Sequence, residues 1–418
     1  MTSQTSTSSA EALGFSSNRL ARLSRHISAY IERGLLVGVN ALVLRRGKVA
    51  YSESFGHHAK NGAPLQVDSL FRIYSMTKPV TSVAALILYE QGRLMLDAPV
   101  TRYLPKFKTT KVVAGSAVRG LKLVEQTNPM TVRHLLTHTA GLSYGWFDDT
   151  PVDALYRATG MVPAKTRLSE FVDMLAEQPL AFQPGSAWRY SHATDVLARV
   201  VEEAADESLD SFFKTHILEP LNMQDTAFGV SAENAKRLTS VYGPSDTFVF
   251  GMDYSPLPRD AKLYPLDTPE QGNFVEPDIA LNGFSGGGGL VSSISDYANF
   301  AQMLLNRGEF GGNRILSPKT VDLMTLNHIP SRLRPLEIGG FGMLGIGFGL
   351  GVSVLEDVAA AGLLGSAGLY GWGGAAMTTF WVDPAEDLVG LFMTQFMPND
   401  FYDLLRECRV LTYAALVN

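Results

Sequence analysis

Cysteine is almost absent from this chain, because Cys408 is the only one among 418 residues. A disulfide needs two cysteines and a cysteine-rich zinc site needs several, so neither can form within the chain. Cys408 lies in a helix-like segment, where a lone cysteine usually serves as a small packed residue. We therefore expect no metal and no other cofactor.

Charged residues are also few. Asp, Glu, Lys and Arg make up 18% of the chain, the net charge is -6, and no run of basic residues occurs. Proteins that bind nucleic acid or anionic membranes usually cluster Lys and Arg, so both partners are excluded here. Hydrophobic residues make up 46%, which is enough for a large core and gives no sign of disorder. The expected partner is a small molecule.

A membrane-spanning run is missing as well. The longest uncharged stretch, between Asp357 and Asp383, is interrupted by six glycines. It is better explained by turns that lead into a strand than by a membrane helix. Residues 1–10 are rich in Ser and Thr and lack the pattern of a signal peptide, which predicts a cytoplasmic protein. Residues 1–14 are expected to form a disordered tail.

The stretch around Ser75 carries the clearest chemical signal. A helix is expected from Thr81 to Gln91, with apolar residues at steps of three and four. Ser75 and Lys78 are three residues apart at the start of this helix, so the hydroxyl and the amine share one face. An amine with a lowered pKa can take the proton of a serine nucleophile. Alternatively, the short S-x-x-K pattern is accidental, with Ser75 as a helix cap and Lys78 in solvent.

Two further segments could complete such a site. Tyr190 lies at the start of a helix expected from Ala193 to Ala205, and a nearby lysine would make its phenol a usable base. The alternative is an ordinary packed tyrosine. Trp372-Gly373-Gly374 reads as a glycine-rich turn leading into a strand from Met377, where backbone N–H groups could approach an oxyanion. Glycine-rich turns before strands are common, so this segment alone is weak evidence for an active site.

Together, Ser75-x-x-Lys78, Tyr190-Ser191-His192 and Trp372-Gly373-Gly374 resemble the three active-site motifs of the serine β-lactamase/penicillin-binding-protein superfamily. The greatest similarity is to the class C β-lactamase-like esterases, the family VIII carboxylesterases. The segment from His134 to Leu142 resembles another hallmark of that family, as do Pro184-Gly185 and Glu219 to Met223 with Asp225-Thr226. The resemblance covers roughly residues 15–415.

The resemblance implies a role for each matched residue. Ser75 would be the acylated nucleophile, and Lys78 and Tyr190 together the general base. The oxyanion hole would be formed by the backbone N–H groups of Ser75 and Ala375. The residues implied to contact the substrate are Trp372, Gly373, Gly374, His192 and Tyr144.

Two departures from the family pattern bear on the substrate. The third motif of the β-lactamases begins with a lysine that helps to bind the carboxylate of the substrate, whereas Trp372 stands here. An aromatic wall suits neutral, apolar acyl esters. The second motif commonly ends in an asparagine that contacts the β-lactam side chain, whereas His192 stands here. Good β-lactamase activity is therefore not expected, and His192 is interpreted as a space-filling residue.

The expected fold is α+β, of the β-lactamase/transpeptidase type, with an antiparallel sheet flanked by helices. A hairpin from Val37–Leu44 and Val49–Ser54 would join C-terminal strands at Phe348–Leu355, Ala376–Val382 and Leu388–Phe396. Residues 1–105 and 285–418 would form this α/β domain, and residues 106–284 a mainly helical insertion. The active site is expected in the cleft between them, with the irregular stretch 240–284 shaping one wall.

Two other kinds of motif occur in the chain. Ser143 and Ser285 each lie in a G-x-S-x-G pattern, but the strand expected before such a nucleophile elbow is missing. His134 and His138 have the spacing of zinc ligands but lack the glutamate of H-E-x-x-H, so packing at a helix end is favoured.

The predicted function is that of a serine carboxylesterase acting on short- to medium-chain acyl esters. Acyl transfer to an alcohol and weak hydrolysis of β-lactams are alternatives on the same site. A non-catalytic, penicillin-binding-like sensor is an alternative of another class, although the presence of Ser75, Lys78 and Tyr190 speaks against it.

Overall fold

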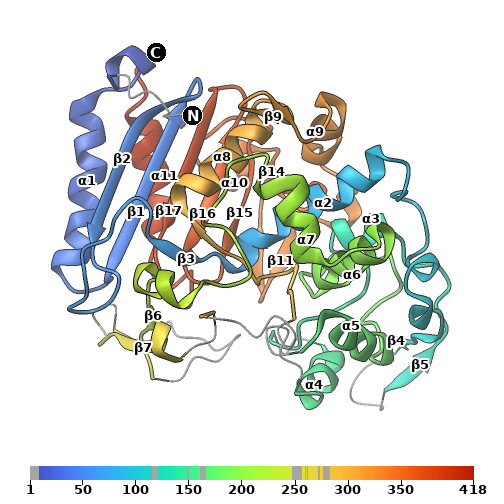
Figure 1. The fold of residues 1–418 in the computed structure, drawn as a ribbon. Coiled ribbons are helices and arrows are strands. Elements are labelled where there is room, and N and C mark those ends of the chain that lie inside the picture. Colours follow the sequence, from blue (N-terminus) through green and yellow to red (C-terminus); the bar gives the residue numbers. More distant parts are fainter. Residues whose placement is uncertain are drawn as a thin grey trace.

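The fold is centred on a seven-stranded antiparallel sheet with the order β13-β14-β15-β16-β17-β1-β2 (Figure 1). A computed structural model describes residues 9–114, 121–147, 150–160, 166–246, 257–258, 260, 262–271, 274–275 and 283–418. The strands are β1 Gly38–Arg45, β2 Lys48–Gly56, β13 Ile346–Phe348, β14 Ser353–Leu355, β15 Tyr370–Gly374, β16 Thr378–Asp383 and β17 Leu388–Met393. Because β1 pairs with β17, the N-terminal hairpin joins the C-terminal strands as predicted.

Helices cover both faces of this sheet. On one face, α1 (Ser17–Glu32) and α11 (Leu404–Ala414) pack together and bury Trp381 and Phe392. On the other face, α8 (Ile294–Leu305) packs on β16 and β17. Every residue of β1 is buried, which fits a central strand covered on both sides. The predicted α+β class is confirmed.

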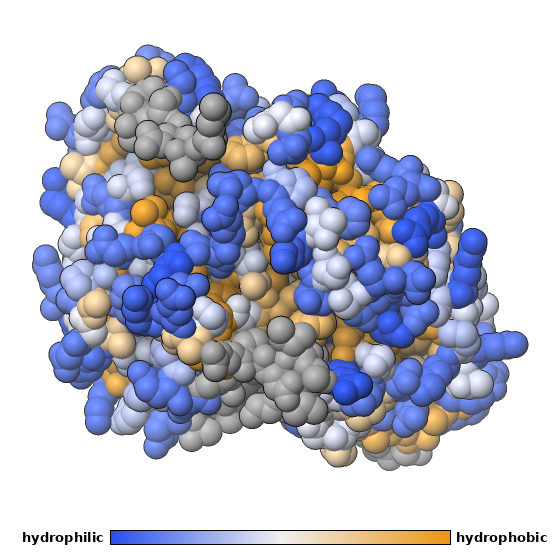
Figure 2. Space-filling model, viewed as in Figure 1, coloured by the Kyte–Doolittle hydropathy of each residue, from blue (hydrophilic) through white to orange (hydrophobic). Residues whose placement is uncertain are grey.

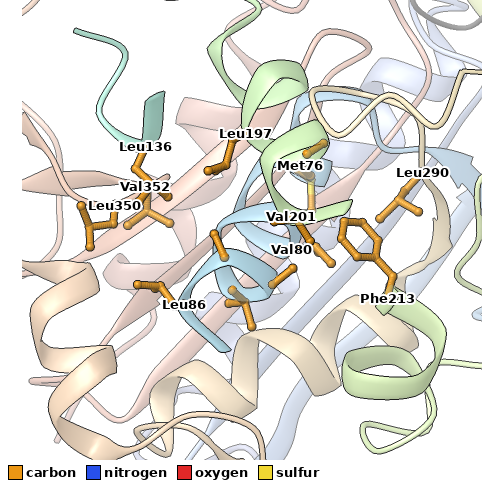
Figure 3. Packing of buried hydrophobic residues seen from close by; sticks show 14 of the residues in the cluster. Met76, Val80, Leu86, Leu136, Leu197, Val201, Phe213, Leu290, Leu350 and Val352 are labelled. Carbon is orange, nitrogen blue, oxygen red and sulfur yellow. The ribbon is translucent and has the colours of Figure 1, made fainter. Parts of the chain in front are cut away.

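The helix α2 (Thr77–Glu90) lies at the centre of the largest core. Figure 3 shows Met76 and Val80 packed among Leu197 and Val201 of α6 (Ala193–Ala205) and Phe213 of α7 (Leu209–Phe213). The helix begins four residues before its predicted start, because a proline is tolerated in a first helical turn. Lys78 thus belongs to the helix, and Ser75 to the short 3-10 turn η2 (Tyr74–Met76) that precedes it.

The middle of the chain supplies most of the remaining helices. The helix α6 lies where the sequence predicts it, and α5 (Leu168–Glu177) packs against it. Short elements complete the fold: α3 Val132–Leu136, α4 Pro151–Ala158, α9 Pro318–Thr325, α10 Val358–Ala361, and the strand pairs β3 Leu70–Arg72 with β8 Val291–Ser293, β4 Val112–Ala114 with β5 Lys122–Val124, β6 Val241–Gly243 with β7 Tyr264–Asp267, β9 Glu309–Phe310 with β10 Asn313–Arg314, and β11 Leu336–Ile338 with β12 Phe341–Met343.

Two predicted strand boundaries were wrong. The expected strand Phe348–Leu355 is divided into β13 and β14 by a turn at Gly351, whose φ of 92° is a left-handed conformation that favours glycine. The Trp372-Gly373-Gly374 stretch is not a turn but the end of β15, since it pairs with β16.

Two irregular regions were also predicted incorrectly. Within the supposedly disordered tail, Glu11–Leu13 form a turn of helix, and Leu13 and Phe15 are buried beneath α1 and α11. Residues 1–8 lie outside the described residues. In the stretch 240–284, β6 and β7 form an antiparallel pair with a register shift between Val241 and Tyr242, and much of the remainder lies outside the described residues.

Polar residues dominate the visible surface, and hydrophobic ones gather in the hollow at the centre of the view (Figure 2). Within the described part of the chain, no helix combines the length and the apolar character needed to cross a bilayer. Cys408 is fully buried in α11, as expected for a packed thiol.

Candidate active site

The backbone next to Ser75 is held by a hydrogen bond from α8. The Tyr297 hydroxyl of α8 donates to the carbonyl of Met76 at 2.7 Å. Tyr74, the residue before the serine, has a φ of 42°, a strained conformation for a residue with a side chain. Such strain persists only where the surrounding structure enforces it, and it concentrates at functional sites. Ser75 therefore has a fixed orientation at the entrance of α2.

Lys78 is directed at Ser75 from inside the protein. Its Nζ atom donates to Ser75 Oγ at 3.1 Å and to the carbonyl oxygen of Gly287 at 2.6 Å. The side chain is 1% exposed and forms no ion pair with any described residue. The predicted proximity of hydroxyl and amine is thus present, and the lysine is buried rather than solvated.

Tyr190 completes the group of three predicted catalytic side chains. Lys78 Nζ lies 4.8 Å from the centre of the Tyr190 ring. The indole N–H of Trp372 donates to the Tyr190 hydroxyl oxygen at 3.2 Å. Residues from η2, α2, the start of α6 and β15 therefore meet at one point, although they are far apart in the sequence.

Two neighbouring titratable groups remain neutral near pH 7. Burial, reinforced by the charge of Lys78, lowers the pKa of His138 well below its usual range. Burial and the neighbouring Tyr190 raise the pKa of Tyr144 well above its usual range. Neither side chain is therefore suited to exchange protons there.

The end of β15 approaches the nucleophile closely. A Cβ atom on Gly374 would lie 2.4 Å from the carbonyl oxygen of Ile73, so only glycine allows this approach. The pairing of β14 with β15 ends at Gly371, which leaves the following residues without a partner strand on that side. Ser75 and Ala375 line the same cavity, as an oxyanion hole formed by their N–H groups requires.

A cavity of about 460 Å³ opens beside these residues. Ser75 and Tyr190 line it, as do Arg406 and Arg409 of α11. Most of its wall is apolar or glycine backbone, including Trp372, Gly373 and Gly374, which the sequence placed at the substrate. The other lining residues are Trp146, Phe147, Ile338, Met343, Ser353, Leu363, Leu369, Gly371, Ala375, Thr379, Phe380, Trp381, Asn399 and Leu405.

Tyr144 and His192, also placed at the substrate from the sequence, do not line this cavity. The rings of Tyr144 and His192 pack against each other with centroids 4.3 Å apart. The ring of Trp146 lies against His192, with centroids 5.9 Å apart. His192 Nδ1 is 2.9 Å from Asp195 Oδ2, so the imidazole is engaged inside the protein. His192 is therefore a hydrogen-bonded residue of the interior rather than a lining residue of the cavity, and Trp146 and Phe147 form that part of the wall.

Sequence reasoning missed several residues of the site. Trp146 and Phe147 follow the Ser143 segment directly, and two aromatic residues in a loop were the available signal. Ile338 and Met343 belong to the hairpin β11–β12, where no motif marks them. Gly287 lies in a run of four glycines, Gly286 to Gly289, where no motif marks it, although its carbonyl oxygen accepts a hydrogen bond from Lys78.

The competing serines have structural partners. Ser143 is fully buried and is hydrogen-bonded to both Asp153 and Arg189. Ser285 donates to Asp195 Oδ1 at 2.6 Å. Neither serine has a histidine partner among the described residues, so neither has the arrangement of an activated nucleophile.

The two histidines with zinc-like spacing point to separate partners. His134 accepts the N–H of Thr131 and completes the capping box of α3, a helix-end role as predicted. His138 packs its ring on Tyr190 with centroids 4.9 Å apart. In the described part of the chain, no three His, Cys, Asp or Glu side chains gather as metal ligands would.

Comparison with known proteins gives consistent results. The sequence model of a family described as Beta-lactamase matches residues 23–413. Esterase EstB of Burkholderia gladioli is 32% identical over 384 residues, which cover 90% of this chain and 91% of EstB. Monacolin J acid methylbutanoyltransferase of Aspergillus terreus is 28% identical over 379 residues, with 85% of each chain covered. The solved structure of EstCE1, a hydrolase with promiscuous acyltransferase activity, superposes with a TM-score of 0.76 at 28% identity, covering 95% of this chain and 99% of that one.

Proposed function

The chain belongs to the beta-lactamase family, and from this membership and the site geometry we propose that it is a serine carboxylesterase of the family VIII type. It hydrolyses short- to medium-chain acyl esters of neutral, apolar character. The observation that carries this proposal is the buried contact of Lys78 Nζ with Ser75 Oγ, beside a largely apolar cavity that Ser75 lines.

The reaction proceeds in two halves. Ser75 Oγ attacks the ester carbonyl while its proton passes to the Lys78/Tyr190 pair, and the N–H groups of Ser75 and Ala375 stabilise the oxyanion. As the intermediate collapses, the pair returns the proton to the leaving alkoxide, and an acyl-Ser75 ester remains. Water then attacks this ester by the same sequence of proton transfers, which releases the acid and restores Ser75.

The walls of the cavity favour esters over β-lactams. The lysine that binds a carboxylate in β-lactamases is replaced by Trp372, whose ring packs on Phe348 with centroids 5.2 Å apart. Polar or anionic groups are disfavoured near this wall, because removing them from water without a hydrogen-bond partner costs free energy. The aromatic residues Trp146, Phe147 and Trp372 together suit an apolar acyl or alcohol group.

The first test is the hydrolysis of p-nitrophenyl butyrate by the wild type and by Ser75→Ala. We expect the variant to lose at least about 10³-fold in kcat, because no other nucleophile is activated. A fluorophosphonate probe should label Ser75 in the wild type and leave the variant unlabelled. Unchanged turnover by the variant would refute the proposal and direct attention to Ser143 or Ser285. A wild type that neither turns over esters nor reacts with the probe would support the sensor alternative.

Tyr190→Phe tests the base. Removal of the phenol hydroxyl should lower kcat by about 10²-fold or more while the protein remains folded, because the ring and its packing are retained. The measurement is single-turnover acylation with p-nitrophenyl butyrate, alongside thermal melting. An acylation rate equal to that of the wild type would remove Tyr190 from the base.

Acyl transfer to an alcohol is a second candidate activity. Two similar proteins carry it in their names, as a methylbutanoyltransferase and as a hydrolase with promiscuous acyltransferase activity. The chemistry differs only in the second nucleophile, which would be an alcohol in place of water. Addition of 1-butanol to the p-nitrophenyl butyrate assay should yield butyl butyrate if the acyl-enzyme accepts alcohols. Product that consists of butyrate alone would restrict the enzyme to hydrolysis.

We also propose a domain organisation and a cellular location. Residues 1–105 and 285–418 would form one α/β domain and residues 106–284 a helical insertion, since the strands of the large sheet come from the former and α3 to α7 from the latter. A cytoplasmic location agrees with a single cysteine that is buried and unpaired, as is usual in a reducing compartment.

A further inference from the structure

Asp195 is a buried carboxylate close to the catalytic lysine. It is 1% exposed and is the third residue of α6, a position where a carboxylate can accept hydrogen bonds from groups at the helix start. Nothing in the three catalytic motifs includes this residue. A buried acid remains charged only when hydrogen bonds or opposite charges compensate it, so its partners indicate what it does.

Three groups donate to or face this carboxylate. Ser285 Oγ donates to Oδ1 at 2.6 Å, and the backbone N–H of Gly287 donates to the same oxygen at 3.0 Å. His192 Nδ1 lies 2.9 Å from Oδ2. Burial by itself would raise the pKa of Asp195, but the bonds from His192 and Ser285 and the charge of Lys78 outweigh it and hold that pKa below its ordinary value.

Gly287 connects Asp195 to Lys78. Its N–H is held by Asp195, and its carbonyl oxygen accepts the 2.6 Å hydrogen bond from Lys78 Nζ. A Cβ atom on Gly287 would lie 2.6 Å from Asp195 Oδ2, so only a glycine fits between the carboxylate and the lysine. The position of the Lys78 ammonium therefore depends on where Asp195 holds this residue.

The titratable groups around Lys78 come from two segments. His192 and Asp195 lie at the start of α6, Tyr190 precedes them, and His138 and Tyr144 lie on the segment after α3. Burial keeps both His138 and Tyr144 neutral, as their shifted pKa values indicate. Among the described residues, Asp195 is the carboxylate on which the charge of Lys78 acts.

We propose that Asp195 is a positioning residue of the reaction: through Gly287 it fixes Lys78 Nζ on Ser75 Oγ. This inference rests on the proposed function, because it concerns the rate of the Ser75 acylation. It also explains the histidine in the second motif, which binds the positioning carboxylate rather than the substrate.

The test compares Asp195→Asn with Asp296→Asn. Both carboxylates are buried, both are the third residue of a helix, and both accept from one hydroxyl and one backbone N–H, but Asp296 lies in α8 without contact to Lys78. Asn is nearly the same size as Asp and removes the charge. We expect Asp195→Asn to lower kcat for p-nitrophenyl butyrate by about 10- to 100-fold with KM nearly unchanged, and Asp296→Asn to retain wild-type kcat.

The division of the effect between kcat and KM separates positioning from a merely structural role. A distorted cavity would weaken substrate binding and raise KM, whereas a displaced Lys78 lowers kcat with little change in KM. Asp296→Asn should change neither constant. A kcat for Asp195→Asn equal to that of the wild type would overturn the proposal.

A second pair of variants covers the case in which Asp195→Asn does not fold. Gly287→Ala should lower kcat strongly, because its Cβ displaces the carboxylate, whereas Gly288→Ala should be tolerated, since its nearest neighbours are 3.7 Å away. Equal activities of the two alanine variants would overturn the proposal. Phosphonate labelling of Ser75 in the wild type is measured in parallel, so that a protein without esterase activity is distinguished from an esterase without this positioning residue.

Discussion

Trp372 combines two functions in one side chain. Its ring forms part of the cavity wall, and its N–H donates to the hydroxyl oxygen of Tyr190 at 3.2 Å. A donor at this oxygen fixes the orientation of the phenol.

Trp372→Phe should therefore reduce the rate more than the fit of the substrate. Phenylalanine keeps most of the ring but lacks the N–H, and loss of one hydrogen bond of about 1 kcal/mol predicts a roughly fivefold lower kcat. The matched control is Trp188→Phe, because Trp188 also stacks on Tyr190 but its buried N–H has no hydrogen-bond partner in the described part of the chain. Steady-state kinetics with p-nitrophenyl butyrate gives kcat for both variants. Equal kcat values for the two variants would contradict a role for the indole N–H.

At the scale of elements, the turn between β13 and β14 is fitted against α2. Gly351 lies in this turn with a φ of 92°, and a Cβ atom there would lie 1.9 Å from Ser82 Oγ on the helix. The glycine is needed both for its backbone conformation and for the space it leaves. The edge of the sheet and the helix that carries Lys78 are thereby brought into direct contact.

Gly351→Ala should be clearly destabilising, because left-handed strain of about 1–2 kcal/mol adds to an overpacking cost of about 1–3 kcal/mol. Gly47→Ala is the control, since that residue has a φ of 70° but no atom within 4 Å of the added Cβ. Gly47→Ala should therefore lose only the part of the unfolding free energy that is due to backbone strain. Urea unfolding of both variants measures the difference. If Gly351→Ala were no less stable than Gly47→Ala, the close contact with α2 would be unimportant.

For the whole molecule, Arg45 joins segments from both ends of the chain. Its guanidinium donates to the carbonyl oxygens of Leu13 and Asn418 at 3.0 and 2.7 Å, and it forms an ion pair with Glu386 at 2.8 Å. The side chain is almost fully buried, so these acceptors satisfy a charge that water does not reach. One residue of β1 thus holds the first and last described segments against the sheet.

Arg45→Ala should lower the free energy of unfolding by about 3 kcal/mol, because buried acceptors lose their donor. The catalytic rate at 25 °C should be retained, since the residue lies far from Ser75 in the sheet. Thermal melting and kcat are measured on the same sample. Arg307→Ala removes an exposed arginine paired with Asp322 and should leave the melting temperature nearly unchanged. A similar melting temperature for both variants would refute the role assigned to Arg45.

The amino-acid sequence alone determined those features that depend on near neighbours. The spacing of Ser75 and Lys78 placed a hydroxyl beside an amine, because residues three apart share a helix face. Hydrophobic periodicity located most of α2 for the same reason. The family motifs located Tyr190 and Trp372, which the structure places in hydrogen-bond contact.

Only the tertiary structure decided which distant groups serve these residues. The carbonyl that holds Lys78 is 209 residues further along the chain, and the carboxylate that holds Gly287 is 92 residues before it. No local period encodes such contacts, since they arise when α2, α6 and the glycine run pack into one core. For that reason the roles of His192 and Asp195, the strand assignment of Trp372–Gly374 and the wall formed by Trp146 and Phe147 were visible only in the folded molecule.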